Sequence, residues 1–398
     1  MPWKKSSVVL ERQRFALAAL RASKAFVGLC VDYEISRKTG YKWLARYVEG
    51  GVAALGDRSR RPKRCAREQP ACWKRRVRQV RLLRPHWGAK KIRARLRELY
   101  PRQRLPALST VSRWLYELGL IGWRPRRARR GPLVPHPGLT SARRLHHVWT
   151  VDFKGWFCTA DGHHHHPLTV REAHSRYLLE IRLLAAQSEE AVRRVMARLF
   201  RQHGLPQAIR VDNGSPFGGK GALGLSRLSV WWLRLGIRVE FTRRARPGDN
   251  AAHEQMHGRY KMETLQPAAA NRSAQQRRTD RWRHDYNHHR PHEALDQKYP
   301  ALGYARSKRR CPQSWPALEY PKSFGVRRVR SHGDIQWRGQ LRFIGRAFVG
   351  QIVGLKPLSS HHWAVRLGAL LIGELHAKDP TGLRPARWLR LPEKPLKV

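Results

Sequence analysis

Acidic residues, cysteine and long apolar runs are all scarce in this sequence. Asp and Glu number 28 in 398 residues against 81 Lys and Arg, which leaves a formal net charge of +53. A chain with that excess repels itself, so we expect it to bind a polyanion, of which nucleic acid is the commonest. The five cysteines are far apart and form no C-x-x-C pair. They therefore indicate neither a disulfide framework nor a zinc ribbon, and they are typical of a reducing compartment.

No apolar run approaches the roughly 20 residues that a membrane span requires, and the first residues lack the apolar stretch of a signal peptide. No lipid-anchor motif accompanies the basic residues, which disfavours a membrane surface as the partner. We therefore expect a cytoplasmic protein. A disordered basic tail is excluded, because 41% of the residues are hydrophobic and 15 are Trp. The length predicts roughly two to four domains.

The first 55 residues have the pattern of three short helices. The third, ISRKTGYKWLARYV, starts at the plausible N-cap Ser36 and carries basic residues on its outer side. This arrangement predicts a helix-turn-helix, in which the third helix presents its N-terminal residues to base edges. The candidate DNA contacts are Arg37, Lys38, Thr39 and Lys42. The alternative is an ordinary three-helix bundle with a solvated basic face.

A second helical unit of the same kind follows a basic linker. Three apolar stripes between residues 71 and 122 predict three helices, and the basic side chains on them favour a second DNA-binding module over a packing domain. Its candidate DNA contacts are Lys90, Lys91 and Arg113. The run WRPRRARR then predicts a segment that tracks phosphates, or alternatively a solvated tether. Its candidate contacts are Arg124, Arg126, Arg127, Arg129 and Arg130.

From about residue 146 the composition changes to strands alternating with helices. The strand-like stretches VWTVDF, PLTV and RYLLEIRLL are separated by short connections, and the later stretches AIRV and IRVEF alternate with helical patterns. Strands that are grouped first and then alternate with helices indicate an α/β domain on a mixed sheet. Beyond about residue 320 the apolar period shortens to two. Hairpins expected around Gly333 and Gly339 predict a small all-β C-terminal domain, whose role as a DNA contact or an oligomer contact stays open.

Three acids in the α/β region could perform chemistry. Asp152 lies inside an apolar strand, where an unpaired carboxylate is expensive, and Asp212 ends the strand AIRVD. Glu254 falls in the first turn of a helix that Asn250 can cap, with Lys261 seven residues further on. Taken singly, each has a structural explanation: a satisfied buried acid, a turn residue and a first-turn acid favoured by the helix dipole.

Together, the three acids form a different kind of site. Strand-end acids in one α/β sheet can converge on the crevice where such folds bind ligands, and a helix can add the third. Three carboxylates without a Cys or His quartet suit Mg²⁺ or Mn²⁺ and not zinc. Two such ions about 4 Å apart can activate a hydroxyl on one side of a phosphodiester and stabilise the leaving oxygen on the other.

Along essentially its whole length the chain resembles bacterial insertion-sequence transposases of the retroviral-integrase type, the DDE recombinases. The strings that carry the resemblance are ISRKTGYKWL (35–44), HWGAKKIRARL (86–96), VWTVDFKGWF (148–157), AHSRYLL (173–179), IRVDNGSPF (209–217), RPGDNAAHEQMH (246–257) and YNHHRPHEAL (286–295). The resemblance implies a ribonuclease H-like core and a D, D, E triad that binds two Mg²⁺ or Mn²⁺ ions. Residue by residue, the triad falls on Asp152, Asp212 and Glu254, and Lys261 matches a position thought to hold DNA.

The resulting expectation is a multidomain protein with all-α helix-turn-helix N-terminal units, an α/β ribonuclease H-like catalytic core and a small all-β C-terminal domain. The expected domains are a helix-turn-helix domain (1–55), a basic linker (56–70), a second helix-turn-helix-like domain (71–122), a second basic linker (123–145), the integrase catalytic core (146–270), a helical extension of the core (271–318) and a small β-barrel-like domain (319–398).

Several positions depart from the family pattern. Glu34 occupies a turn position where relatives usually carry Gly, which can require a positive φ. Glu172 stands where Asp is usual, and His163 to His166 fill what we expect to be a solvated loop. The 41 residues between Asp212 and Glu254 form a longer gap than usual, with the excess expected in the loop 217–226.

The expected function is that of a DNA transposase that binds terminal inverted repeats and catalyses metal-dependent strand cleavage and strand transfer. Its expected partner is double-stranded DNA, from the element ends and the target, with a homo-oligomer forming on that DNA. We expect no membrane partner and no small-molecule cofactor, and a bacterial, nucleoid-associated location. Two alternatives stay open: a catalytically inactive DNA-binding repressor of the element, and a ribonuclease H-type nuclease.

Overall fold

The computed structural model describes residues 7–22, 24–58, 69–122, 139–243, 247–314, 317–379 and 382–386. The chain divides into two compact units, Met1–Pro70 and Ala71–Val398. The predicted DNA contacts Arg124, Arg126, Arg127, Arg129 and Arg130 lie outside the described residues. No helix in the described ranges is long and apolar enough to cross a membrane.

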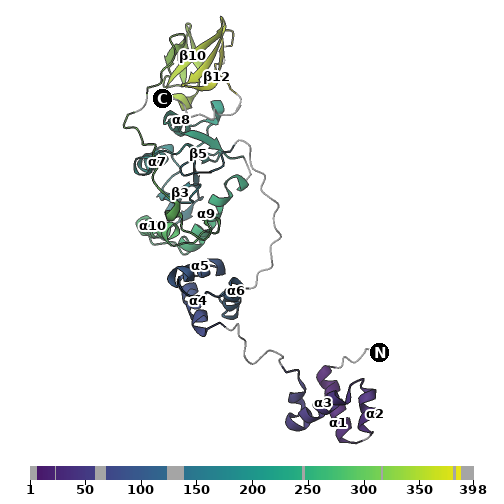
Figure 1. Ribbon diagram of the computed structural model, residues 1–398. Helices are drawn as coiled ribbons and strands as arrows, with labels where there is room; N and C mark the ends of the chain where they lie inside the picture. The colour runs from purple at the N-terminus through teal and green to yellow at the C-terminus, as the bar shows by residue number, and fades with distance from the viewer. Residues whose placement is uncertain are drawn as a thin grey trace. The chain divides into compact units, whose positions relative to one another are not determined.

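The first unit is all-helical, as expected (Figure 1). Its elements are α1 (Val8–Leu20), α2 (Phe26–Asp32), α3 (Arg37–Gly50) and the short 3-10 helix η1 (Val52–Leu55). Ser36 caps α3 by accepting a hydrogen bond from the N–H of Thr39. A Cβ on Gly40 would lie 2.8 Å from the sulfur of Cys30, so α3 packs closely on α2. Glu34, in the turn before α3, has a φ of 51°, which confirms the expectation of a glycine-favouring conformation there.

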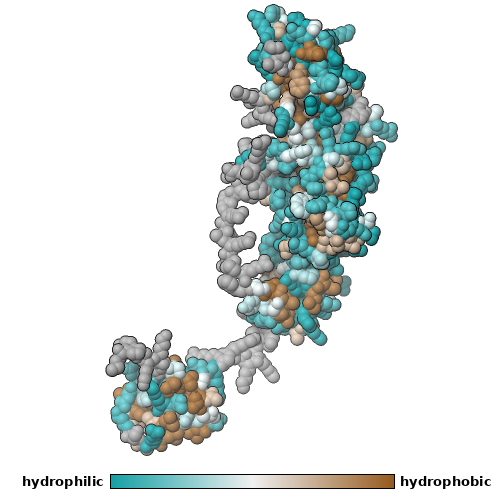
Figure 2. Space-filling model, turned by 180° about the vertical axis from the view of Figure 1, so that it is seen from behind, coloured by the Kyte–Doolittle hydropathy of each residue, from teal (hydrophilic) through white to brown (hydrophobic). Residues whose placement is uncertain are grey.

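The surface of this first unit carries apolar side chains. Figure 2 shows hydrophobic residues gathered in patches on it, and Val8, Val31 and Val48 are each more than three-fifths exposed. Its buried core is small in comparison and is built around Phe15, Leu29 and Cys30.

The second unit opens with another three-helix bundle. Its helices are α4 (Ala71–Leu83), α5 (Ala89–Leu99) and α6 (Leu108–Glu117). The predicted apolar stripes are largely buried, with Val77, Ile92, Leu96, Val111 and Leu115 fully inside. Three tryptophans fill the rest of this core: Trp73, Trp87 and Trp114. Leu83 and Leu99, the last residues of their helices, are exposed, because the stripes leave the core at the helix ends.

A mixed sheet forms the centre of the second unit (Figure 1). Its strands are β1 (Val148–Phe153), β2 (Phe157–Cys158), β3 (His164–Glu172), β4 (Leu178–Leu184), β5 (Ala208–Val211) and β6 (Arg238–Phe241). The order is β2-β3-β1-β5-β6, with β4 also paired to β3. The pairs β1–β3 and β3–β4 are antiparallel, and β1–β5 and β5–β6 are parallel. This topology, with its helices, is the expected α/β core.

Helices pack against the sheet in two apolar clusters. The elements are α7 (Glu189–His203), η2 (Ala222–Gly224), α8 (Arg227–Arg234), η3 (Pro247–Asn250), α9 (Ala251–Thr264), α10 (Arg272–His288), η4 (Glu293–Leu295) and η5 (Pro300–Gly303). One cluster joins α7 and α8 to the sheet through Phe200 and Trp232. The other joins α9 and α10 to β4 through Tyr260 and Trp282. Within the long segment between Asp212 and Glu254, the extra residues form η2 and a β-bridge between Gly218 and Leu225.

The histidine run is not the loop expected from the sequence. His164, His165 and His166 belong to β3, where β2 and β4 pair with them. The side chain of His165 is buried, and its Nε2 lies 3.0 Å from the hydroxyl of Thr159. The pairing of neighbouring strands overrides the polar composition of the run.

The C-terminal region is all-β, as expected. Its elements are β7 (Gly325–Arg328), β8 (Asp334–Trp337), β9 (Gln340–Phe343), η6 (Arg346–Phe348), β10 (Ile352–Ser359), β11 (His362–Leu367), β12 (Leu370–His376) and β13 (Arg384–Pro385). The hairpin at Gly339 joins β8 to β9, but the hairpin predicted around Gly333 was wrong. There β7 pairs with the later strand β10, which gives a five-stranded sheet in the order β13-β12-β11-β10-β7 beside the two-stranded one.

Candidate active site

Asp152 lies near the end of β1, and Asp212 comes directly after the neighbouring parallel strand β5. β1 and β5 pair in a register that sets Val148 beside Ala208 and Thr150 beside Arg210. Continued by two residues, the same register places Asp152 beside Asp212, and adjacent strands stand about 4.8 Å apart. The residues before them, Val151 and Val211, are fully buried, so the apolar approach fixes both strands while the acids reach their ends.

Glu254 comes from the first turn of α9, where its side chain is exposed. Asn250 occupies the N-cap position of this helix, but its side chain makes no capping hydrogen bond, so the predicted cap was wrong. Glu254 nevertheless belongs to the same electrostatic site as the two aspartates. Burial, and then the negative charges of Asp212 and Glu254, raise the pKa of Asp152 to about 7. The pKa of Asp212 is also raised, mainly by burial.

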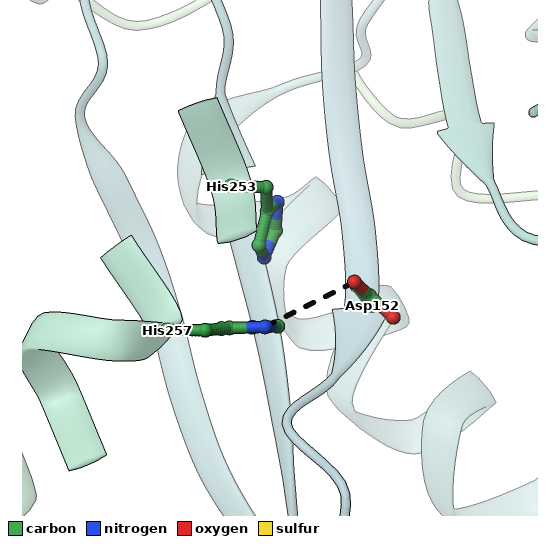
Figure 3. A group of neighbouring side chains, drawn as sticks. All are labelled: Asp152, His253 and His257. Atoms are coloured by element: carbon green, nitrogen blue, oxygen red, sulfur yellow. Dashed lines mark ion pairs between the residues drawn. The ribbon is translucent and has the colours of Figure 1, made fainter. Parts of the chain in front are cut away.

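Two histidines of α9 stand behind Asp152, and Figure 3 shows them with that carboxylate. His253 and His257 are buried, and Nδ1 of His257 lies 4.0 Å from a carboxylate oxygen of Asp152. The hydroxyl of Thr169 on β3 lies 2.6 Å from Nε2 of His253 and 2.8 Å from Nε2 of His257. The same hydroxyl donates to the backbone carbonyl of Asp152 at 2.9 Å. These side chains therefore fix α9 against β1 and β3 at the position of Asp152.

The proton positions follow from this geometry. Thr169 has one hydroxyl proton and gives it to a carbonyl, so each imidazole donates its Nε2 proton to the hydroxyl oxygen. Nδ1 of His257 then presents a lone pair to Asp152. A lone pair and a carboxylate face each other favourably only with a proton or a cation between them.

Neither histidine supplies positive charge to the site. Burial above all, and then Lys154, lowers the pKa of His257 to about 3, and burial and His257 lower that of His253 well below its usual range. Both rings are therefore neutral near pH 7. Lys154 lowers the pKa of Asp152, but less than burial and the other two acids raise it. Lys154 therefore offsets only part of the effects that raise the pKa of Asp152.

One set of described side chains at this site brings its donor atoms close together. Donor atoms of Asp152, His253 and His257 all lie within 4.8 Å of one another. However, each ring nitrogen of His253 already contacts a threonine hydroxyl, on Thr150 or Thr169. Asp152, Asp212 and Glu254 are not such a group among the described residues; their carboxylate oxygens are nevertheless the kind of ligand that Mg²⁺ and Mn²⁺ prefer.

Sequence reasoning missed the role of the two histidines. Their H-x-x-x-H spacing in NAAHEQMH does place both on one face of a helix. That spacing was the available signal, but the partners Thr150 and Thr169 belong to strands about a hundred residues away in sequence.

The predicted DNA contacts of the first unit lie at the start of α3. Arg37, Lys38 and Lys42 are exposed, as a recognition helix requires. Thr39 is half-buried, and its hydroxyl lies 3.0 Å from that of Ser36 at the helix cap. The three basic side chains are therefore accessible to DNA, whereas Thr39 takes part in holding the helix start.

The predicted contacts of the second unit differ in exposure. Lys261 on α9 is exposed. Lys90 forms an ion pair with Glu293, and Arg113 lies 3.5 Å from Glu117. Lys91 is half-buried, and burial, followed by Arg290, lowers its pKa to about 8. Of these residues, Lys91 is the least suited to bind phosphate in solvent.

Four segments of the chain match models of known protein families. Residues 142–247 and 235–300 match two models of the integrase core domain. Residues 39–115 match a homeodomain-like domain, and residues 325–361 match the C-terminal domain of IS481 family transposases. The all-α, α/β and all-β parts described above thus each contain a matched segment.

Two curated proteins are similar over about half of this chain. One is the insertion element IS407 uncharacterized 31.7 kDa protein of Burkholderia multivorans, 28% identical over 204 residues, which are 51% of this chain and 70% of that protein. The other is the insertion element IS476 uncharacterized 39.2 kDa protein of Xanthomonas euvesicatoria, 27% identical over 188 residues, which are 47% of this chain and 52% of that protein.

Among solved structures, the chain is similar to one in the simian T-cell lymphotropic virus intasome with the PP2A regulatory subunit B56 gamma. The identity is 14% and the TM-score 0.36, over 76% of this chain and 99% of that one. The HTLV-2 integrase catalytic core domain in complex with magnesium has 10% identity and a TM-score of 0.30, over 41% of this chain and 99% of that one. Likenesses this loose carry no argument about the site.

Proposed function

The chain belongs to the integrase-core transposases of bacterial insertion sequences, and from that premise we propose that it binds the terminal inverted repeats of its element and cleaves and joins DNA strands. Asp152, Asp212 and Glu254 are the proposed catalytic residues, and they hold two Mg²⁺ or Mn²⁺ ions. The protein acts as a homo-oligomer on the element ends and the target DNA. The observation that supports this most directly is the pKa of Asp152, which burial and then the charges of Asp212 and Glu254 raise.

The donor set fits hard divalent cations. Three carboxylates supply oxygen ligands only, and their mutual repulsion is relieved by a cation among them. Such ions, when bound, activate a hydroxyl and stabilise the leaving oxygen at a phosphodiester. Bound cations would also explain how three carboxylates can approach the negatively charged DNA backbone, on a chain whose net charge of +53 attracts that backbone.

Side chains around the three acids hold the proposed catalytic residues in position. Thr169 and the two buried histidines fix Asp152 through the β1 backbone, while Glu254 faces solvent, where the DNA backbone arrives. The first step is in-line attack by water on the phosphodiester at an element end, which breaks the phosphorus–oxygen bond and releases a 3′-hydroxyl. That hydroxyl then attacks a phosphodiester of the target, so each step forms one phosphorus–oxygen bond and breaks one.

A labelled duplex that carries the inverted repeats flanking the coding region tests this proposal. With Mn²⁺ we expect cleavage and strand transfer, both lost in Asp152→Ala and in Glu254→Gln by at least about a hundredfold, the scale of losing one electrostatic group at an active site. Affinity for the duplex should stay near normal. The matched control is Glu190→Gln, an exposed acid on α7 with a side chain 81% exposed.

The other outcomes separate the alternatives. Binding without metal-dependent chemistry in any variant would indicate a repressor. Preference for an RNA–DNA hybrid over the inverted-repeat duplex would indicate a ribonuclease H-type nuclease. Activity of Glu254→Gln within a few-fold of the parent would show that Glu254 is not the third acid.

The proposed recognition helix has its own test. Arg37→Ala should weaken binding to the inverted repeat by about 1 to 3 kcal/mol, the value of one contact to a base edge, and should affect random DNA less. The control Arg126→Ala, in the second linker, should reduce binding to both DNAs alike and lower the salt dependence by about one charge. Equal effects of Arg37→Ala on specific and random DNA would contradict base reading by α3.

A further inference from the structure

A second group of potential metal ligands lies in the C-terminal sheet, apart from the candidate active site. His362 stands at the start of β11, and Glu374 and His376 stand at the end of β12. The two strands are antiparallel, and their register sets His362 directly beside His376 and Ala364 beside Glu374. Since alternate residues of a strand share a face, all three side chains rise from the same face of the sheet.

The three side chains already approach one another. Nε2 of His362 lies 2.8 Å from a carboxylate oxygen of Glu374, and Nε2 of His376 lies 3.8 Å from the same oxygen. The two imidazole rings are stacked, with centroids 4.0 Å apart and planes 19° apart. One ligand atom from each residue lies within 4.8 Å of the others.

These separations are close to those of a tetrahedral ion. Ligands held at about 2.0 to 2.1 Å from a tetrahedral Zn²⁺ stand roughly 3.3 Å from each other. The two printed contacts, 2.8 and 3.8 Å, lie on either side of that value. Because an imidazole lone pair lies in the ring plane, the stacked rings must rotate to point both Nε2 atoms at one ion. None of the three side chains is buried, so the rings have room to turn and the ion has a path from solvent.

From this geometry we infer that His362, Glu374 and His376 form a binding site for Zn²⁺ or a similar borderline transition metal. Two imidazoles and one carboxylate suit zinc, whereas Mg²⁺ prefers oxygen ligands alone. Three protein ligands leave a fourth position for water or for a donor from a bound partner. The site is independent of the proposed strand-transfer chemistry, and the segment matched to the IS481 C-terminal domain ends at residue 361, before all three ligands.

The arrangement is less well explained by hydrogen bonding alone. A hydrogen bond between His362 and Glu374 explains one of the two contacts, but Nε2 of His376, 3.8 Å from the same oxygen, is too far away for a second one. A shared metal ion keeps both rings neutral, gives each a strong partner and neutralises the carboxylate.

Zinc titration of the full-length protein tests the site. The protein is freed of metal with EDTA, and bound Zn²⁺ is measured by competition with a chromogenic chelator. The chain has 20 His, so the readout is the difference between proteins. The parent should bind one more tight equivalent than the double variant His362→Ala/His376→Ala, and Glu374→Gln alone should weaken that equivalent by at least about tenfold.

Controls and a second readout make the result decisive. His361→Ala removes the neighbouring exposed histidine and should keep the parent's stoichiometry. Co²⁺ in place of Zn²⁺ should give the intense visible absorption of a four-coordinate ion in the parent and in His361→Ala, and not in the double variant. All variants should show the parent's circular dichroism in EDTA. Equal stoichiometry and equal Co²⁺ spectra in the parent and the double variant would overturn the proposal and leave a hydrogen-bonded cluster.

Discussion

Two groups in this molecule have the same composition, two histidines and a carboxylate, and opposite surroundings. In the core, His253 and His257 are buried beside Asp152 and bonded to threonine hydroxyls. In the C-terminal sheet, His362 and His376 are partly exposed, stack on each other and both lie near Glu374. Their different surroundings determine what each group can bind.

The difference shows that ligand identity alone does not define a metal site. The core histidines have spent most of their hydrogen-bonding capacity on Thr150 and Thr169, so they serve to hold Asp152 in place. The carboxylate of Asp152 interacts with the charges of Asp212 and Glu254, and we propose that it binds a hard cation. The C-terminal rings contact only the carboxylate and each other in the described part of the chain, so their nitrogens can turn to a softer ion. Burial is the cause of this contrast.

Asp152→Asn should have the largest effect on stability. In the metal-free protein the pKa of Asp152 is about 7, against an ordinary value of 3.8. The folded state therefore holds this proton more tightly than the unfolded chain, and stability is lost as the pH rises through about 7. Asparagine removes the penalty, so the variant should exceed the parent by roughly 2 to 4 kcal/mol at pH 8, with no gain below about pH 4. Chemical unfolding in EDTA, followed by fluorescence at both pH values, measures this.

The control for that prediction is Asp161→Asn. Asp161 is exposed and has a lowered pKa, mainly because the Thr159 hydroxyl donates to it, so its replacement should give no gain at pH 8. Mn²⁺ should narrow the gap between Asp152→Asn and the parent, because an ion that binds only the folded parent stabilises it. If Asp152→Asn gains as much stability over the parent at pH 4 as at pH 8, then burial and the neighbouring carboxylates do not raise the pKa of Asp152.

Thr169→Val should have the next largest effect. Valine keeps the shape but removes the hydroxyl between the two histidines and the Asp152 carbonyl, which leaves buried imidazole donors unpaired. We expect a loss of about 1 to 3 kcal/mol in stability and a lower turnover, while the affinity for DNA stays unchanged. Thr169→Ser should restore both the stability and the turnover.

Thr264→Val is the matched control for this effect. Its buried hydroxyl donates to the Tyr260 carbonyl inside α9, so the substitution should cost stability without changing turnover at the same folded fraction. Equal loss of turnover in the two valine variants would mean that Thr169 acts through stability alone.

In the core site, the sequence predicts the features that depend on the local pattern of residues. The strands that carry Asp152 and Asp212 follow from apolar residues around each acid, and Glu254 follows from a helix start. The histidine layer behind Asp152 does not follow, because it depends on the register of β1 with β3, which set Asp152 beside Thr169.

The C-terminal group was also out of reach of sequence reasoning. His362 and His376 become neighbours only through the pairing of β11 with β12. The wrong hairpin at Gly333 has the same origin, since β7 finds its partner in β10 and not in the next strand. Local periodicity predicts strands, whereas pairing depends on the whole sheet.

In the metal-free protein, His376→Ala should change the free energy of unfolding less than Asp152→Asn or Thr169→Val. The side chain is 31% exposed and its contact to Glu374 is 3.8 Å long, so its loss should change the unfolding free energy by less than about 0.5 kcal/mol. With Zn²⁺ present, the parent should gain stability and the variant should not. Thermal unfolding with EDTA and with Zn²⁺ measures both. A loss of more than about 1 kcal/mol in EDTA would mean that the C-terminal histidines support the fold as the core pair does, and the contrast between the two groups would then rest on something other than burial.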